Sequence, residues 1–142
     1  MDKAPEQESK AADNLLQLRA KAEAEPIASF LKMRLLELSP GYARIAMKLT
    51  PEYLNFNELI FGGIIMAVAD QAFAYASNSA TPRSIASQFN IHFIAGAEVT
   101  DELIAEGRVI KSGRRAGISE IVITNRDGKL IAKATGTTIP VG

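Results

Sequence analysis

The most apolar part of the chain is residues 57–79, NELIFGGIIMAVADQAFAYASNS, which contains few polar positions after Phe61. Two glycines, Gly62 and Gly63, open this stretch, and a single carboxylate, Asp70, lies in its middle. A helix that is apolar nearly all round must be enclosed on most sides by other elements. The pattern therefore predicts one long central helix, and it raises the question of why this helix contains an acid.

Alternating apolar and polar positions predict strands on both sides of this helix. Residues 31–35 and 45–49 alternate in this way around the turn segment SPGY, and they predict a hairpin. After the helix, four more strands are predicted over residues 85–94, 102–111, 116–125 and 129–140. The Asp127-Gly128 pair is the strongest hairpin signal among their connections. Closely spaced strands pair antiparallel, and a curved antiparallel sheet around one helix gives an α+β fold.

The N-terminal part of the chain has a different composition. Residues 1–12 contain almost nothing that could drive burial, so we predict a disordered lead, followed by a single domain over residues 13–142. Asp13 is suited to cap an extra N-terminal helix that extends to about residue 25. Pro26 then begins a turn or a new helical segment.

Composition excludes several classes of site. The chain has 16 basic and 16 acidic residues, so its formal net charge of zero favours neither nucleic acid nor an anionic membrane as a partner. The absence of cysteine excludes disulfides and a cysteine nucleophile, and the single histidine, His92, argues against a metal site. The polar N-terminus lacks the apolar core of a signal peptide, and no apolar run is long enough to span a bilayer. We therefore expect a cytoplasmic protein without a bound metal.

Asp70 has two interpretations. Its helical neighbours Met66, Ala67, Phe73 and Ala74 offer no charge partner. A buried carboxylate without a partner is costly and has a raised pKa, which is typical of a catalytic group. A salt bridge to a distant lysine or arginine, or hydrogen bonds to amides, would explain the residue equally well. The residue alone leaves both interpretations open.

Gly62 and Gly63 lie at the predicted helix start, where backbone N–H groups lack intrahelical partners and a ligand can approach closely. Such N–H groups suit a carbonyl oxygen that becomes an oxyanion, although the glycines could also serve only to let a strand pack closely. Gly63 and Asp70 are seven residues apart, or about 10 Å along a helix, so they cannot both touch one reacting carbonyl. If they share a reaction, two antiparallel copies of the helix must meet in a two-fold dimer.

The segment from Asn55 to Asn78, with NFNELIFGG, AVAD and AFAYASNS, resembles the hotdog-fold acyl-CoA thioesterases of the phenylacetate-degradation type. A looser resemblance runs from Pro26 to Thr138 and includes NIHFIAGAEVTDELIAEGRVIKSGRRAG and DGKLIAKATGT. It implies a long helix wrapped by an antiparallel sheet, assembled as homodimers and usually as dimers of dimers. It also implies an acyl-CoA substrate and no cofactor.

The resemblance assigns roles to individual residues. In the family, the acid matching Asp70 attacks the thioester carbonyl or activates a water. The backbone N–H matching Gly63, from the partner subunit, polarises the carbonyl oxygen, and the asparagine matching Asn55 lines the site. Together these residues predict hydrolysis of an acyl-CoA to the free acid and coenzyme A. We expect Phe61 and Gly62 to border the substrate.

Two further positions remain open in the sequence. Some members of the family orient water through a serine or threonine on the strand after the helix, for which Ser87 is a candidate and Ala86 competes by register. Arg114, with Lys111 and Arg115, flanks a turn and could bind the phosphates of coenzyme A, since arginine suits phosphate. A solvated hairpin tip would explain Arg114 as well.

One departure from the family concerns Phe61. The family usually has histidine immediately before the two glycines, and this chain has an apolar ring. That change leaves room for a non-catalytic acyl-CoA-binding or regulatory hotdog protein. With only His92, which is expected on a polar strand face, the histidine–aspartate pairing of hotdog dehydratases is difficult to build. Thioester hydrolysis is therefore the favoured reaction.

Overall fold

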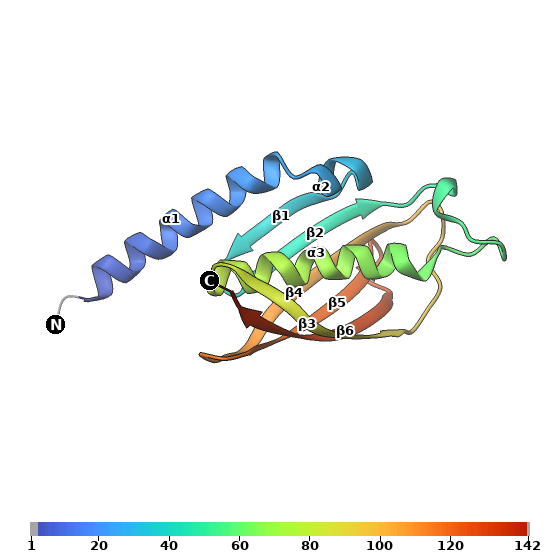
Figure 1. Cartoon of the computed structure of the whole chain (residues 1–142). Coiled ribbons are helices and arrows are strands. Elements are labelled where there is room, and N and C mark those ends of the chain that lie inside the picture. The colour runs from blue at the N-terminus through green and yellow to red at the C-terminus, as the bar shows by residue number, and fades with distance from the viewer. Residues whose placement is uncertain (1–2, 142) are drawn as a thin grey trace.

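A curved six-stranded antiparallel sheet wraps around one long helix in the computed structural model, which describes residues 3–141 (Figure 1). The strands follow the order β1-β2-β4-β5-β6-β3 across the sheet. Their bounds are β1 Arg34–Ser39, β2 Tyr42–Lys48, β3 Ser84–Phe93, β4 Glu102–Ser112, β5 Gly117–Asn125 and β6 Leu130–Pro140. The helices are α1 Lys3–Glu23, α2 Pro26–Leu31 and α3 Gly62–Ala80, with a short 3-10 turn η1 at Pro51–Tyr53. The predicted α+β architecture is confirmed.

Local turn chemistry sets the hairpins where the sequence predicts them. Gly41, in the turn between β1 and β2, has a φ of 77°, and Gly128, between β5 and β6, has a φ of 84°. In the second turn the side-chain oxygen of Asn125 accepts hydrogen bonds from the N–H groups of Asp127 and Lys129. A positive φ suits glycine because it has no Cβ, so these turns fix the register of the strands they join.

The core lies between the concave face of the sheet and α3. The largest fully buried side chains come from both layers: Phe73, Ile45, Met47, Leu103, Ile121, Ile123, Ile131 and Val68. Two glycines of the sheet let α3 approach closely. A Cβ on Gly136 would collide with the ring of Phe73, and a Cβ on Gly107 would lie 2.7 Å from the Ala72 carbonyl oxygen. Small residues on the sheet therefore set the position of α3 and of the residues it carries.

The N-terminal helix corrects one prediction. α1 begins at Lys3, ten residues before the predicted helix start, so the disordered lead predicted for residues 1–12 is replaced by helix over residues 3–12. Residues 1–2 lie outside the described residues. The Ala, Glu, Gln and Lys residues of this segment have high helix propensity, and the segment continues the part of α1 that packs on α3. The single-domain boundary at residue 13 stays a prediction.

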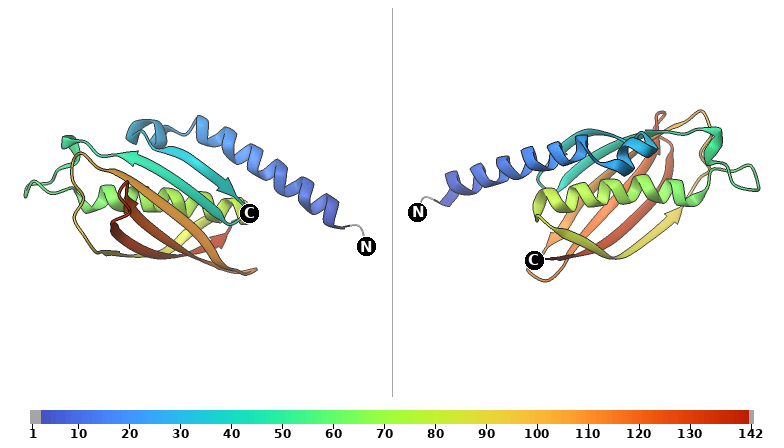
Figure 2. Two further views of the ribbon diagram at one scale, coloured as in Figure 1. Left: turned by 180° about the vertical axis from the view of Figure 1, so that it is seen from behind. Right: turned by 45° about the horizontal axis from the view of Figure 1, so that its top comes forward.

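The two ends of α1 have different surroundings. Its N-terminal half extends beyond the sheet, whereas its C-terminal half packs on β1 and α3 (Figure 2). Asn14 donates from its side-chain amide to the carbonyl oxygens of Asn78 and Ser79, at 3.1 and 3.2 Å, and Arg19 donates to the carbonyl of Leu38 at 3.2 Å. Across residues 3–141, no helix is long and apolar enough to cross a membrane.

Candidate active site

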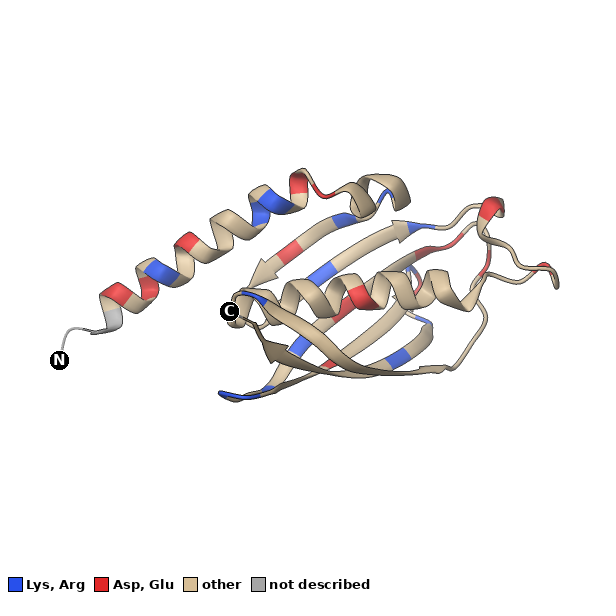
Figure 3. Cartoon of the chain, in the orientation of Figure 1, with Lys and Arg blue, Asp and Glu red and all other residues tan. Residues whose placement is uncertain are grey.

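Asp70 lies on the face of α3 that the sheet does not cover. It is exposed in the single chain, as are Met66 and Ala74, one helical turn before and after it. In Figure 3, α3 is tan except for one red position, and Asp70 is the only charged residue of its sequence. The prediction of a fully buried acid is therefore wrong for one chain, because a single curved sheet covers only one side of the helix.

No cation neutralises Asp70 within residues 3–141. The ion pairs of this region join other residues, and no hydrogen bond to the Asp70 carboxylate is found there. Partial burial raises the pKa of Asp70 above its ordinary value, since the charged form loses hydration. The salt-bridge interpretation left open by the sequence therefore lacks a partner in this part of the chain. The geometry instead leaves the carboxylate free to meet a ligand.

The start of α3 presents free backbone donors. The helix begins at Gly62, and the Phe61 carbonyl accepts the Ile64 N–H at 2.9 Å. Within the described residues, no hydrogen-bond acceptor is recorded for the N–H groups of Gly62 and Gly63. These two donors lie at the positive end of the helix dipole, where developing negative charge is stabilised. They can therefore bind a carbonyl oxygen that becomes an oxyanion.

Two aromatic rings flank these glycines. A Cβ on Gly63 would lie 2.5 Å from Cε1 of Phe61, and a Cβ on Gly62 would lie 3.3 Å from Cζ of Phe93. Both rings remain more than half exposed, at 57% for Phe61 and 53% for Phe93. Phe61, which the sequence predicts beside the substrate, therefore lies directly against the amide end of α3. Phe93, the last residue of β3, was not predicted to approach this site.

Asn55 holds the loop that leads into α3. Its side-chain oxygen accepts the N–H groups of Asn57 at 2.9 Å and Leu59 at 3.2 Å, and its own N–H donates to the Leu59 carbonyl at 2.7 Å. No acceptor for the Asn55 Nδ2 group is recorded among residues 3–141. The residue thus fixes the loop with its oxygen and keeps its amide hydrogens for a ligand.

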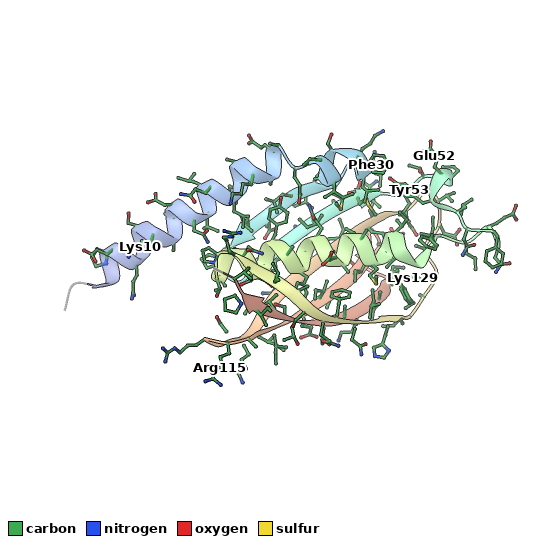
Figure 4. The ribbon with its side chains drawn as sticks, viewed as in Figure 1. Lys10, Phe30, Glu52, Tyr53, Arg115 and Lys129 are labelled. Atoms are coloured by element: carbon green, nitrogen blue, oxygen red, sulfur yellow. The ribbon has the colours of Figure 1, made fainter. Side chains whose placement is uncertain are left out.

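Ser87 and Arg114 lie away from this end of α3 within one chain. Ser87 falls at the β3 bulge between Ala86 and Gln88, is exposed, and donates to the Thr137 carbonyl at 3.3 Å. The bulge explains why the sequence could not decide between positions 86 and 87. Arg114 is exposed in the β4–β5 turn, at the end of the molecule where α3 finishes and where Figure 4 labels its neighbour Arg115.

A second carboxylate, not predicted from the sequence, binds the side of α3. One oxygen of Glu25, in the link between α1 and α2, accepts hydrogen bonds from the side chains of Gln71 and Tyr75, at 2.9 Å from the latter. Gln71 and Tyr75 are only 8% and 5% exposed. Burial, together with this hydrogen bond and the charge of Glu25, raises the pKa of Tyr75 far above its ordinary value. Gln71, a polar residue directly after Asp70 in an apolar helix, was the feature of the sequence that could have indicated this contact.

The continuous α3 separates the amide donors from the carboxylate. Seven residues correspond to about 10 Å along the helix, as the sequence argument requires. A free carboxylate and a pair of free amides are the groups that hydrolysis of an activated carbonyl compound needs. Among residues 3–141, no group of three or more metal-ligating side chains is placed to hold an ion. The fold, one long helix wrapped by a curved antiparallel sheet, is the hotdog fold.

Comparison with known proteins supplies the family. The model of the Thioesterase superfamily matches residues 57–132. The acyl-coenzyme A thioesterase PaaI of Escherichia coli is 31% identical over 120 residues, which cover 84% of this chain and 86% of that protein. The chain belongs to the thioesterase superfamily and is a hotdog-fold thioester hydrolase of the PaaI type. The resemblance stated from the sequence is thereby confirmed.

Solved structures agree with this assignment. The structure of the E. coli PaaI protein matches with a TM-score of 0.86 at 30% identity, and covers 94% of this chain and 95% of that one. A mutant of the phenylacetic acid degradation protein PaaI from Thermus thermophilus matches with a TM-score of 0.78 at 27% identity, over 82% of this chain and all of that one, 100%. The larger coverage by the E. coli structure includes part of the N-terminal region.

Proposed function

We propose that this protein hydrolyses acyl-CoA thioesters, and that Asp70 of one chain and the Gly63 N–H of a partner chain act on the same carbonyl. The single observation that carries the proposal is that one helix presents both an unneutralised carboxylate, Asp70, and unpartnered backbone amides at its start. The relative from E. coli, named as an acyl-coenzyme A thioesterase, supports coenzyme A as the carrier of the acyl group. The products are the free acid and the thiol of coenzyme A.

The proposed chemistry uses both groups at once. The Gly63 N–H donates to the carbonyl oxygen and stabilises the negative charge that develops when a nucleophile adds. Asp70 either removes a proton from the attacking water or adds to the carbonyl itself, and in the second case water then releases the acid. In both routes the C–S bond breaks and the leaving thiolate takes a proton. Because both routes need the ionised carboxylate, activity should rise with pH through the pKa of Asp70.

The proposed dimer follows from surfaces that one chain leaves open. β3 is an edge strand of ten residues, SIASQFNIHF, without a charged residue or a proline. Natural edge strands normally carry such residues to prevent pairing, so an edge without them is suited to pair with another chain. The exposed face of α3 around Asp70 adjoins this edge. An antiparallel second copy would bring the start of its α3 to the first copy's Asp70; a dimer of dimers stays a prediction.

Asn55 and Arg114 complete the proposed site. The free Nδ2 group of Asn55 lies on the loop before the amide donors, where it can hydrogen-bond the thioester or a water. Arg114 has no recorded ion pair within residues 3–141 and remains a candidate for the phosphates of coenzyme A. Ser87 is a weaker candidate for orienting water, because its hydroxyl already donates to a backbone carbonyl.

The test measures thiol release from short, medium, long and aryl acyl-CoAs by wild type and Asp70→Asn. Because the chain has no cysteine, a thiol-reactive dye gives no protein background. We expect wild type to release thiol and the variant to lose about 10²- to 10⁴-fold in rate, as for loss of a general base. Equal rates in both proteins would contradict the role of Asp70.

Phe61 favours an alternative function. Phe61 stands where the family usually has histidine, so a chain that binds acyl-CoA without turnover is the alternative. Absence of thiol release from every acyl-CoA, with binding retained by wild type and Asp70→Asn, would support this alternative. Recovery of activity in Phe61→His would then identify the ring as the cause.

A further inference from the structure

An apolar groove lies beside the amide end of α3. One wall comes from residues 59, 60, 62 and 65, at the start of the helix, and the other from residues 93–97, which follow β3. Its volume is about 300 Å³, within the range of pockets that hold small ligands. Gly62 belongs to this wall, so the groove opens directly beside the donors of the proposed site. We refer to it as the 93–97 groove.

The 93–97 groove is lined by no polar side chain, and the free Gly62 N–H lies at its amide end. Every side chain that lines it is apolar or absent, with glycine at positions 62 and 96. Along its second wall, the N–H groups of Ile94 and Ala95 already donate to the Ile131 carbonyl, at 2.8 and 3.1 Å. An amide or hydroxyl buried between these walls, away from Gly62, would lose its hydrogen bonds to water without replacement, which is costly. The groove therefore suits a ligand part that carries only carbon and hydrogen.

A second groove differs from the 93–97 groove in that charged and amide side chains border it. It lies between α1 and α3, with a volume of about 440 Å³, and its lining includes Lys21, Glu25 and Asn78. Ala74 also lines it, and Ala74 is one turn beyond Asp70 on the same exposed face. An acyl-CoA has two dissimilar halves at its thioester: an acyl group and an arm with two amides. The charged and amide side chains that border this second groove can hydrogen-bond the amides of the arm.

We propose that the 93–97 groove is the acyl-binding subsite, and that it selects acyl groups without polar substituents through Phe93 and its apolar walls. The proposal rests on the proposed function, because it takes the Gly63 N–H as the place of the thioester carbonyl. An acyl group in this groove has its carbonyl at the start of α3, next to Phe61. The sulfur then points to the Asp70 side, towards the second groove of the other chain.

Gly96 offers a way to fill the groove. A Cβ at this position would meet no atom within 4 Å, and its backbone conformation is one that other residues adopt. Gly96→Leu therefore adds bulk to the lining of the groove from a Cβ that meets no neighbouring atom. Thr100→Leu is the matched control, because it adds the same side chain to an exposed position of the same loop that does not line the groove.

The experiment measures binding of non-hydrolysable S-alkyl-CoA thioethers, with two to ten carbons, to the full-length chain by calorimetry. In wild type and Thr100→Leu, affinity should rise about fourfold per methylene until the groove is full. In Gly96→Leu the rise should stop several carbons earlier. A terminal hydroxyl on the alkyl chain should remove most of the gain in wild type. Phe93→Ala should weaken the longer thioethers and spare the shortest.

Each outcome bears on one proposal. Unchanged chain-length dependence in both Gly96→Leu and Phe93→Ala would overturn the acyl subsite, even if wild type hydrolyses acyl-CoAs. Ala74→Leu, which adds bulk to the second groove, is measured in the same way. If it alone changes the chain-length dependence, the acyl group lies in the second groove and the proposal is overturned. Absence of any thioether binding would do the same. The expected dependence without thiol release from acyl-CoAs would support the subsite and contradict the proposed hydrolysis.

Discussion

Asp70 stands alone as a charge on α3, and its environment determines how folding responds to pH. Partial burial raises its pKa in the folded protein above the value in the unfolded chain. The contribution of this group to stability is therefore full below the unfolded pKa and is lost as pH rises through the folded pKa. At neutral pH the ionised carboxylate destabilises the fold.

Asp70→Asn should therefore be more stable than wild type at pH 7, and the difference should shrink towards pH 3. Thermal unfolding of both proteins from pH 3 to pH 7, at one protein concentration, measures this difference. Asp127→Asn, in the exposed β5–β6 turn, is the control. A constant difference between wild type and Asp70→Asn across this range would contradict the effect of burial.

At the residue scale the sequence predicted which groups matter better than where they lie. Asp70 and Gly63 were singled out because an acid interrupts the apolar stretch and two glycines open it, and Phe61 because the family usually has histidine at that position. The exposure of Asp70 could not be predicted, because the number of apolar positions does not reveal which face of a helix a single sheet leaves open. Phe93 reaches Gly62 only through the fold, since thirty residues separate them in sequence.

At the scale of elements, Glu25 joins the N-terminal helices to α3. Its carboxylate accepts hydrogen bonds from two buried side chains, Gln71 and Tyr75, and these have no other recorded partner within residues 3–141. Removal of the acceptor would leave buried donors unsatisfied, which costs more than the net value of the bonds themselves. The contact therefore holds the α1–α2 link on the helix that carries Asp70.

Glu25→Ala should lower the free energy of unfolding by about 1–3 kcal/mol, since it leaves buried hydrogen-bond donors without a partner. Urea titration at fixed protein concentration measures this loss. Glu23→Ala, which removes an exposed acid two residues earlier, is the control and should change stability by less than about 0.5 kcal/mol. Equal losses of unfolding free energy in the two variants would show that the hydrogen bonds of Glu25 to α3 do not stabilise the fold.

The elements with strong local signals were predicted well. The turns at Gly41 and Gly128 allowed the two hairpins to be predicted, and the apolar run allowed α3 to be predicted. The start of β1 was placed three residues early, because α2 extends to Leu31 and Lys32 then adopts a left-handed conformation with a φ of 55°. The extra length of α1 was missed because the absence of apolar residues was interpreted as disorder, although its residues favour a helix.

At the scale of the whole molecule, the proposed site is formed by two chains, because Gly63 and Asp70 of one chain are about 10 Å apart along α3. The order of helix and strands predicts a curved antiparallel sheet around one helix, and the resemblance to the family identifies this arrangement as the hotdog fold. The proposed site needs a second copy, which a single sequence indicates only through the separation of Gly63 and Asp70. The unprotected edge of β3 and the open face of α3 agree with that separation.

The most direct test of the shared site is complementation between two inactive variants. Asp70→Asn removes the carboxylate, and Gly63→Pro removes the N–H at a helix start, where proline is tolerated. Phe61→Ala is added to the second variant, because its ring would otherwise meet the proline. Each variant alone should be inactive. Circular dichroism checks that each variant is folded, and Phe61→Ala alone should retain activity, which shows that Gly63→Pro causes the loss in the second variant.

Chains of the two variants, co-expressed with different tags, should form mixed dimers in which one site regains both Asp70 and Gly63. For random pairing in a two-fold dimer, about one quarter of the sites are intact, so thiol release should recover to about one quarter of the activity of Phe61→Ala or wild type. Native mass spectrometry measures the fraction of mixed dimers. Mixed dimers that form and release no thiol would contradict the account that two chains share each active site.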